Sequence, residues 1–225
     1  MSVALPIAGT GLPTDPGLWH QVLNDTRTSG SLPRPGLFLD RDGVIVDEVD
    51  YLHRVEDVRL IEDAAETIRA CNDAEVPVVI VTNQSGVGRG YYRWEDFAAV
   101  QAHLLDLLNA EGARIDMVLA CAYHGDGLPP YDIADHPWRK PNPGMLLAAA
   151  DALDIDLSRS WIVGDTAGDI MAGAAAGLAG GIHVMTGHGA RERGAAKIRT
   201  ARTFEIRTAP NIGEAKLVSF LGATN

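Results

Sequence analysis

The chain has 225 residues, of which 46% are hydrophobic and 22% charged, and its formal net charge at pH 7 is −11. This length supports one sizeable core, and the acidic balance argues against the basic face that non-specific binding to nucleic acid or anionic membranes needs. Two cysteines exclude a disulfide framework, and neither a signal peptide nor a long apolar run is visible, so we expect a cytoplasmic protein.

Residues 1–35 are rich in Gly, Pro, Thr and Ser, and we interpret them as an N-terminal extension with a short helix within 16–28. From residue 36 strand and helix patterns alternate, and we take 36–225 as one domain. Strands are predicted at 36–39, 77–81, 117–122, 161–163 and 181–185, and helices at 63–74, 94–110, 144–153 and 169–176.

The strand at 77–81 is apolar in a continuous run, as expected for a parallel sheet that is covered on both faces. The sequence therefore predicts an α/β fold with a Rossmann-like doubly wound parallel sheet. Residues 44–61 are too many for a tight connection, and we expect them to form a small hairpin or flap without a large cap domain. Ligands of such sheets bind beyond the carboxyl ends of the strands, which is where four polar motifs fall.

The first motif is the run Phe-Leu-Asp-Arg-Asp-Gly at 38–43. Asp40 ends a strand, and a rigidly held carboxylate suits a nucleophile that attacks phosphorus in line. Asp42 lies two residues further on and can serve the leaving group as general acid and then water as general base. For this segment alone, a polar turn after a strand is the alternative.

The second and third motifs supply groups for phosphate. Thr82 follows the strand at 77–81, and with its next three residues it offers a hydroxyl, side-chain amides and backbone N–H groups. Lys140 lies between Arg139 and Pro141 and could neutralise charge between the nucleophile and the transferring phosphoryl. A simple turn and a solvated Arg-Lys pair are the alternatives for these two segments.

The fourth motif carries two acids. Asp165 follows the strand at 161–163, and together with Asp40 and a backbone carbonyl near Asp42 it would suffice to bind Mg²⁺. Asp169 comes one helical turn later. It either orients the metal site or is an acid of the kind favoured in the first turn of a helix.

These four segments resemble motifs one to four of the haloacid dehalogenase superfamily of phosphohydrolases, over about residues 36–185. The fuller phrases at 38–43, 82–86 and 139–145 are similar to a narrower group, the D-glycero-D-manno-heptose 1,7-bisphosphate and histidinol-phosphate phosphatases. The resemblance implies Mg²⁺ dependence and an aspartyl-phosphate intermediate. It makes Asp40 the nucleophile, Asp42 the acid/base and Asp165 a metal ligand, and it makes Thr82 and Lys140 phosphate stabilisers. It places contacts with the rest of the substrate at Glu48, Tyr51, Asn83, Gln84, Ser85 and Arg139.

One departure from that group concerns a zinc-binding loop before the lysine. Of its four ligand positions only Cys121 keeps its type, since Tyr123, His136 and Trp138 occupy the others. We expect no zinc and a loop held by packing of Tyr123, Tyr131 and Trp138. The alternative is a rebuilt zinc site from Cys121, His124, His136 and a nearby Asp.

The resulting hypothesis is a phosphatase, a monomer or small homo-oligomer, that acts on a small phosphorylated metabolite and not on nucleic acid or membranes. The expected substrate is heptose 1,7-bisphosphate, cleaved at the 7-phosphate. Histidinol phosphate is a second enzyme reading, and a catalytically silent phosphate-binding protein on the same fold is a third.

Overall fold

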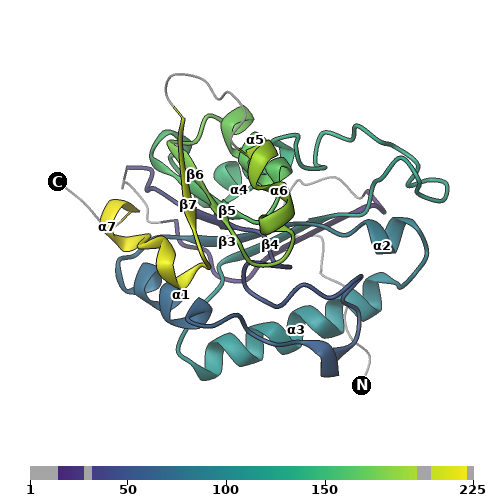
Figure 1. Ribbon diagram of the computed structural model, residues 1–225, viewed down its shortest axis with the longest axis horizontal. Helices are drawn as coiled ribbons and strands as arrows, with labels where there is room; N and C mark the ends of the chain where they lie inside the picture. The colour runs from purple at the N-terminus through teal and green to yellow at the C-terminus, as the bar shows by residue number, and fades with distance from the viewer. Residues whose placement is uncertain (1–14, 28–31, 197–203, 222–225) are drawn as a thin grey trace.

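The computed structural model describes residues 15–27, 32–196 and 204–221. Seven strands form one sheet in the order β1-β4-β3-β2-β5-β6-β7 (Figure 1). The strands are β1 (Leu18–Val22), β2 (Leu37–Leu39), β3 (Val78–Asn83), β4 (Met117–Cys121), β5 (Trp161–Gly164), β6 (Gly180–Val184) and β7 (Glu205–Ala209). All neighbouring pairs are parallel except β1 and β4, which are antiparallel. The α/β prediction of a mostly parallel sheet is confirmed.

Helices cover both faces of this sheet (Figure 1). They are α1 (Ala64–Asp73), α2 (Ser85–Gly88), α3 (Trp94–Ala110), α4 (Gly144–Leu153), α5 (Ala167–Ala176), α6 (Gly189–Ala196) and α7 (Val218–Leu221), with 3-10 turns at Val55–Asp57, Leu157–Arg159 and Gly213–Ala215. In the view of Figure 1, α1 and α3 lie below the sheet and α4 and α5 above it. Within the described ranges, no helix has the length and apolarity needed to cross a membrane.

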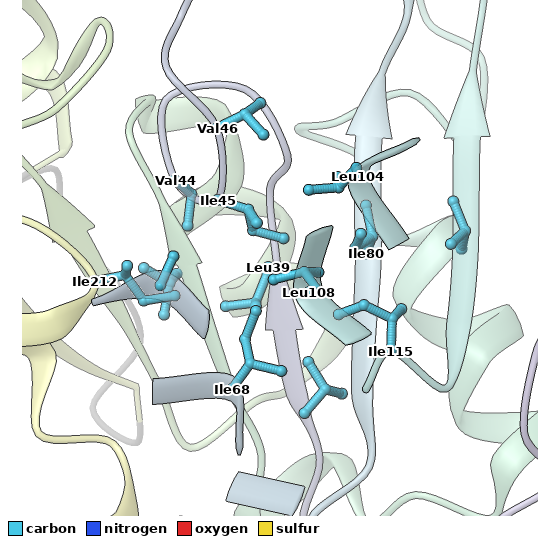
Figure 2. Close-up of a cluster of buried hydrophobic side chains, with 14 of the residues drawn as sticks. Leu39, Val44, Ile45, Val46, Ile68, Ile80, Leu104, Leu108, Ile115 and Ile212 are labelled. Atoms are coloured by element: carbon cyan, nitrogen blue, oxygen red, sulfur yellow. The ribbon is translucent and has the colours of Figure 1, made fainter. Parts of the chain in front are cut away.

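Two apolar cores lie on the two faces, and alternation along each strand assigns side chains to them. On β2, Leu37 and Leu39 belong to the core under α1 and α3, whereas Phe38 belongs to the core under α4 and α5. Figure 2 shows the first of these, with Leu39 and Ile80 from the sheet beside Ile68 and Leu104 from the helices. Burial on both faces explains why these strands are apolar at every position.

The first strand corrects the prediction of a helix within 16–28. Leu18–Val22 is extended and pairs with the edge of the sheet at β4, from Leu18 opposite Cys121 to Val22 opposite Met117. Trp19 on this strand is buried, with its ring 5.8 Å from that of Trp94 and 5.3 Å from that of Phe97. An open strand edge and an aromatic pocket on α3 therefore determine the structure of this segment.

The predicted flap lies over the carboxyl edge of the sheet, although it is not a regular hairpin. It is held by two isolated bridges, Asp42 with Val46 and Val46 with Leu60, and it contains the 3-10 turn Val55–Asp57. Further backbone bonds run from the Asp47 N–H to the Arg59 carbonyl and from the Ile61 N–H to the Ile45 carbonyl. Residues 44–46 are fully buried and anchor its base in the core. This anchoring leaves residues 48–52 as one wall of the pocket described below.

Candidate active site

The three central strands bring their motifs together at one edge. β2 lies between β3 and β5, with Leu39 opposite both Ile80 and Val163. Asp40 follows β2, Thr82 lies near the end of β3, and Asp165 follows β5, and all three line one pocket of about 320 Å³. The convergence predicted from the sequence is therefore present in the structure.

Lys140 is the cation at the floor of this pocket, and its side chain is only 2% exposed. Its Nζ lies 2.9 Å from Asp40 Oδ2 and 2.6 Å from Asp169 Oδ1, and it donates to the Val81 carbonyl. The side-chain amide of Asn83 accepts from the Lys140 N–H at 3.1 Å and donates to its carbonyl at 3.0 Å. Asn83, which we expected to contact substrate, thus also fixes the lysine backbone.

Three carboxylates crowd this lysine. Oxygens of Asp40, Asp165 and Asp169 all lie within 4.8 Å of one another. Burial and the nearby Asp169 raise the pKa of Asp165 to about 7, and burial likewise raises that of Asp40 despite its contact with Lys140. When all three carboxyls are ionised, Lys140 compensates only one of the three negative charges, and hard carboxylate oxygens suit Mg²⁺. The residues present therefore fit a divalent cation of that kind.

Asp169 lies in the first turn of α5, and its two carboxylate oxygens have different partners. Its Oδ2 accepts from the backbone N–H and the hydroxyl of Thr166, which caps the N-terminus of α5. Its Oδ1 contacts Lys140. The same carboxylate therefore begins the helix and positions the lysine.

The Asp42 carboxylate points to different partners and is not part of this acidic cluster. Arg41 donates to both of its oxygens at 3.0 Å, and Gln84 Nε2 donates to Oδ2 at 3.0 Å and to Thr82 Oγ1 at 2.9 Å. Arg41 is fully buried, with its guanidinium 5.2 Å from the Phe97 ring centroid. A forked cation of this kind fixes a carboxylate in orientation as well as in place. We did not predict Arg41 as a site residue, although its position between the two acids was the available signal.

The remaining pocket wall comes from the flap, α2 and the segment before Lys140. It contains Glu48, Tyr51, Ser85 and Arg139 as predicted, and also Val49 and Asp50 from the predicted stretch 48–51. Leu52, Tyr92 and His188 line the pocket as well and were not predicted. Burial, followed by the charge of Asp42, raises the pKa of Glu48 to about 7. His188 donates its backbone N–H to Asp165 Oδ2 at 2.7 Å. No spacing in the sequence linked residue 188 to the four motifs.

A glycine is required where the first motif meets the fourth. Gly43 has a φ of +76°, and a Cβ at this position would lie 2.5 Å from Asp165 Oδ2. The backbone after Asp42 can therefore pass close to the acidic cluster only without a side chain.

In the loop that replaces the zinc-binding loop, the candidate ligands contact other side chains. Tyr123 lies 6.0 Å from Tyr131, and Tyr131 and Trp138 both pack against the apolar core that contains Tyr123, as predicted. Tyr123 also stacks on His136 at 4.1 Å, a contact that was not predicted. His124 contacts Arg89, and Cys121 is buried at the end of β4. In the described part of the chain, the cluster of possible metal ligands is the acidic one and contains none of Cys121, His124 and His136.

Comparison with known proteins identifies relatives of this arrangement. A HAD-hydrolase-like family model matches residues 137–209. A D-glycero-beta-D-manno-heptose-1,7-bisphosphate 7-phosphatase from Mesorhizobium japonicum is 49% identical over 175 residues, which cover 76% of this chain and 80% of the relative.

Two solved structures resemble the fold over most of its length. A putative HAD-like phosphatase from Mesorhizobium loti has a TM-score of 0.82 and 42% identity, covering 93% of this chain and 95% of its own. A D,D-heptose 1,7-bisphosphate phosphatase from B. bronchiseptica, complexed with magnesium and phosphate, has a TM-score of 0.70 and 26% identity, covering 82% and 98%. The chain belongs to the haloacid dehalogenase-like phosphatases and is a phosphoric monoester hydrolase.

Proposed function

We propose that the protein is a Mg²⁺-dependent phosphatase that removes the 7-phosphate of D-glycero-D-manno-heptose 1,7-bisphosphate. The observation that carries the proposal is the placement of Lys140 between Asp40 and Asp169 at the floor of a pocket whose wall contains Arg139. Lys140 and its two acids suit a reacting phosphoryl group, and Arg139 suits a further anion on the same small molecule.

In the first step an Asp40 carboxylate oxygen forms a bond to phosphorus while the bond to the sugar oxygen breaks. Asp42 gives its proton to that oxygen, and the heptose 1-phosphate leaves. In the second step Asp42 takes a proton from water, whose oxygen attacks phosphorus. The bond to Asp40 breaks, and inorganic phosphate is released.

The chain's own groups support both steps. Lys140 offsets the negative charges of Asp40 and of the phosphoryl oxygens. Thr82 is in the same site, and its hydroxyl accepts a hydrogen bond from Gln84. Arg41 holds Asp42 at the pocket. A bound Mg²⁺ would be held by Asp40, Asp165 and the Asp42 carbonyl, with Asp169 alongside, and would supply charge neutralisation of the phosphoryl group.

Arg139 favours a bisphosphate over histidinol phosphate. Burial lowers the pKa of its guanidinium, so an anion beside it would relieve a desolvated charge. Histidinol phosphate would instead bring an ammonium toward this cation. The names of the relatives point in the same direction, toward heptose bisphosphates. Glu48 lies on the same wall and could receive the ammonium of histidinol phosphate. Histidinol phosphate is therefore the second candidate substrate.

The test compares kcat/KM for heptose 1,7-bisphosphate, the 1- and 7-monophosphates and histidinol phosphate, in wild type and Arg139→Ala. We expect the bisphosphate to be the best substrate and Arg139→Ala to lower its kcat/KM about 10- to 100-fold, as for the loss of a charged contact. Arg59→Ala, in the flap but outside the residues that line the pocket, is the matched control.

Two results would overturn the assignment. Histidinol phosphate as the best substrate would exclude the bisphosphate reading. An unchanged bisphosphate preference in Arg139→Ala would remove the residue on which substrate choice is argued. Absence of turnover on every phosphate ester, with phosphate still bound, would instead favour a silent binding protein.

A further inference from the structure

We propose that Asp15 is a positioning residue that places Arg139, through Tyr123 and His136, for recognition of the second anionic group of the substrate. The proposal rests on the proposed function for what Arg139 binds. It rests on the contacts of the N-terminal segment for how Arg139 is held.

Asp15 contacts the loop at two residues that are thirteen positions apart. The Tyr123 hydroxyl donates to Asp15 Oδ1 at 2.6 Å, and His136 Nε2 lies 3.8 Å from Asp15 Oδ2. The rings of Tyr123 and His136 stack on each other at 4.1 Å with an interplanar angle of 13°. The Asp15 carboxylate therefore bonds Tyr123 directly and lies beside His136, which is held against Tyr123 by the stacked rings.

The same two residues hold Arg139. The Tyr123 carbonyl accepts from Arg139 Nη1 at 2.9 Å, and the His136 carbonyl accepts from the Arg139 backbone N–H at 2.9 Å. The side chain of Arg139 thus depends on the residue that is bonded to Asp15, and its backbone depends on the residue that stacks on that one. A displacement of either partner would move the guanidinium relative to Lys140, its neighbour in the chain.

The segment that carries Asp15 is itself anchored. Trp94 Nε1 donates to the Pro16 carbonyl, and the Ala122 N–H donates to the Gly17 carbonyl at 2.8 Å, just before β1 pairs with β4. A Cβ on Gly17 would lie 2.5 Å from Tyr123 Cε2, so the backbone passes directly against the ring. Asp15 is therefore a rigid acceptor and not a mobile surface acid.

The test uses full-length protein and four variants. Asp15→Ala removes the acceptor, and Asp15→Asn keeps an oxygen for the Tyr123 hydroxyl. Tyr123→Phe removes only that hydroxyl. Asp25→Ala is the matched control, because Asp25 lies after the same strand and pairs with Arg27, away from the loop.

The kinetic readout is the ratio of kcat/KM for heptose 1,7-bisphosphate to that for p-nitrophenyl phosphate, which has no second anion. We expect Asp15→Ala and Tyr123→Phe to lower this ratio about tenfold, mostly through KM for the bisphosphate. Asp15→Asn and Asp25→Ala should stay within about twofold of wild type. In the Arg139→Ala background, Asp15→Ala should have no further effect on the ratio.

The structural readout is hydrogen exchange of the peptide spanning residues 123–140. We expect faster exchange in Asp15→Ala than in Asp25→Ala, because the amides of His124 and Arg139 are bonded within this loop. Unchanged exchange in Asp15→Ala would overturn the proposal whatever the substrate. If the kcat/KM ratio falls in Arg139→Ala but is unchanged in Asp15→Ala, the positioning role of Asp15 is overturned while the proposed function stands. If the ratio is unchanged in Arg139→Ala, the proposed function itself is contradicted.

Discussion

Lys140 is buried near three acids, of which Asp40 and Asp165 line the pocket, and Asp40 is the one that follows β2 and contacts the lysine. Its contact with Lys140 at 2.9 Å keeps one carboxylate oxygen in a fixed position. A nucleophile needs such fixation because in-line attack tolerates little misplacement. The proposed mechanism therefore depends on this one side chain.

We expect Asp40→Asn to lower kcat by at least about a thousandfold, because an amide cannot form the aspartyl-phosphate. Steady-state phosphate release is the measurement, with circular dichroism to show that the fold persists. Asp47→Asn, an exposed acid in the flap that does not line the pocket, serves as the control and should retain near-normal turnover. Substantial activity in Asp40→Asn would exclude the covalent mechanism.

Some site residues could be predicted from local sequence patterns, and others are brought to the site only by the tertiary fold. Asp40, Thr82 and Asp165 could be predicted because each lies at or just after the end of an apolar strand, and parallel strands end at one edge. Lys140 follows no strand and was predicted from its place between Arg139 and Pro141, shortly before α4. His188 could not, because its approach to Asp165 depends on the path of the chain after β6. Tertiary geometry of this kind leaves no periodic trace in the sequence.

At the scale of elements, the strands of the interior were predictable and those of the edges were not. Interior strands are buried on both faces, which makes them apolar at successive positions. β7 has three exposed positions of five, and β1 has one buried position of five, so neither carries that pattern. The partner strand, rather than local sequence, determines both.

Burial of Trp19 predicts how much β1 contributes. Trp19→Ala should lower the free energy of unfolding by about 3 kcal/mol, because its ring packs on Trp94 and Phe97. Val22→Ala, on the same strand but 47% exposed, should cost less than about 0.5 kcal/mol. Urea unfolding of both variants is the measurement. Equal costs would show that β1 is not held by this aromatic contact.

The contacts within the loop at 123–139 lead to a prediction about zinc. We expect the purified protein to contain no stoichiometric zinc, since Tyr123 and His136 stack on each other and His124 is held by Arg89. Elemental analysis after purification without added metal is the measurement. The contrary result is roughly one zinc per chain that is lost in Cys121→Ser.

The molecule as a whole carries a formal net charge of −11, and several of its acids line the pocket. Glu48 adds a fourth acid to Asp40, Asp165 and Asp169 near a single buried lysine. The pKa of Asp165 and that of Glu48 are both raised to about 7, with burial the largest cause in each. In the metal-free folded protein these two carboxyls therefore keep their protons up to about pH 7, whereas in the unfolded chain they lose them near pH 4.

The sign of the resulting pH dependence follows from these raised values. The folded protein binds more protons than the unfolded chain between about pH 4 and 7, so its stability falls as the pH rises through this range. We expect the metal-free protein to lose on the order of 2 kcal/mol between pH 5 and pH 8. Thermal unfolding in chelator at both values is the measurement.

Added Mg²⁺ should reverse this loss, because a cation that binds only the folded state stabilises it, and it binds best when the carboxylates are ionised. The rise in Tm on adding Mg²⁺ should therefore be larger at pH 8 than at pH 5. Asp165→Asn should be more stable than wild type at pH 8 in chelator, and its response to Mg²⁺ should be weaker. Asp151→Asn, an exposed acid on α4, should behave as wild type in both respects. An equal response to Mg²⁺ at the two pH values would show that the acidic cluster is not where the cation binds.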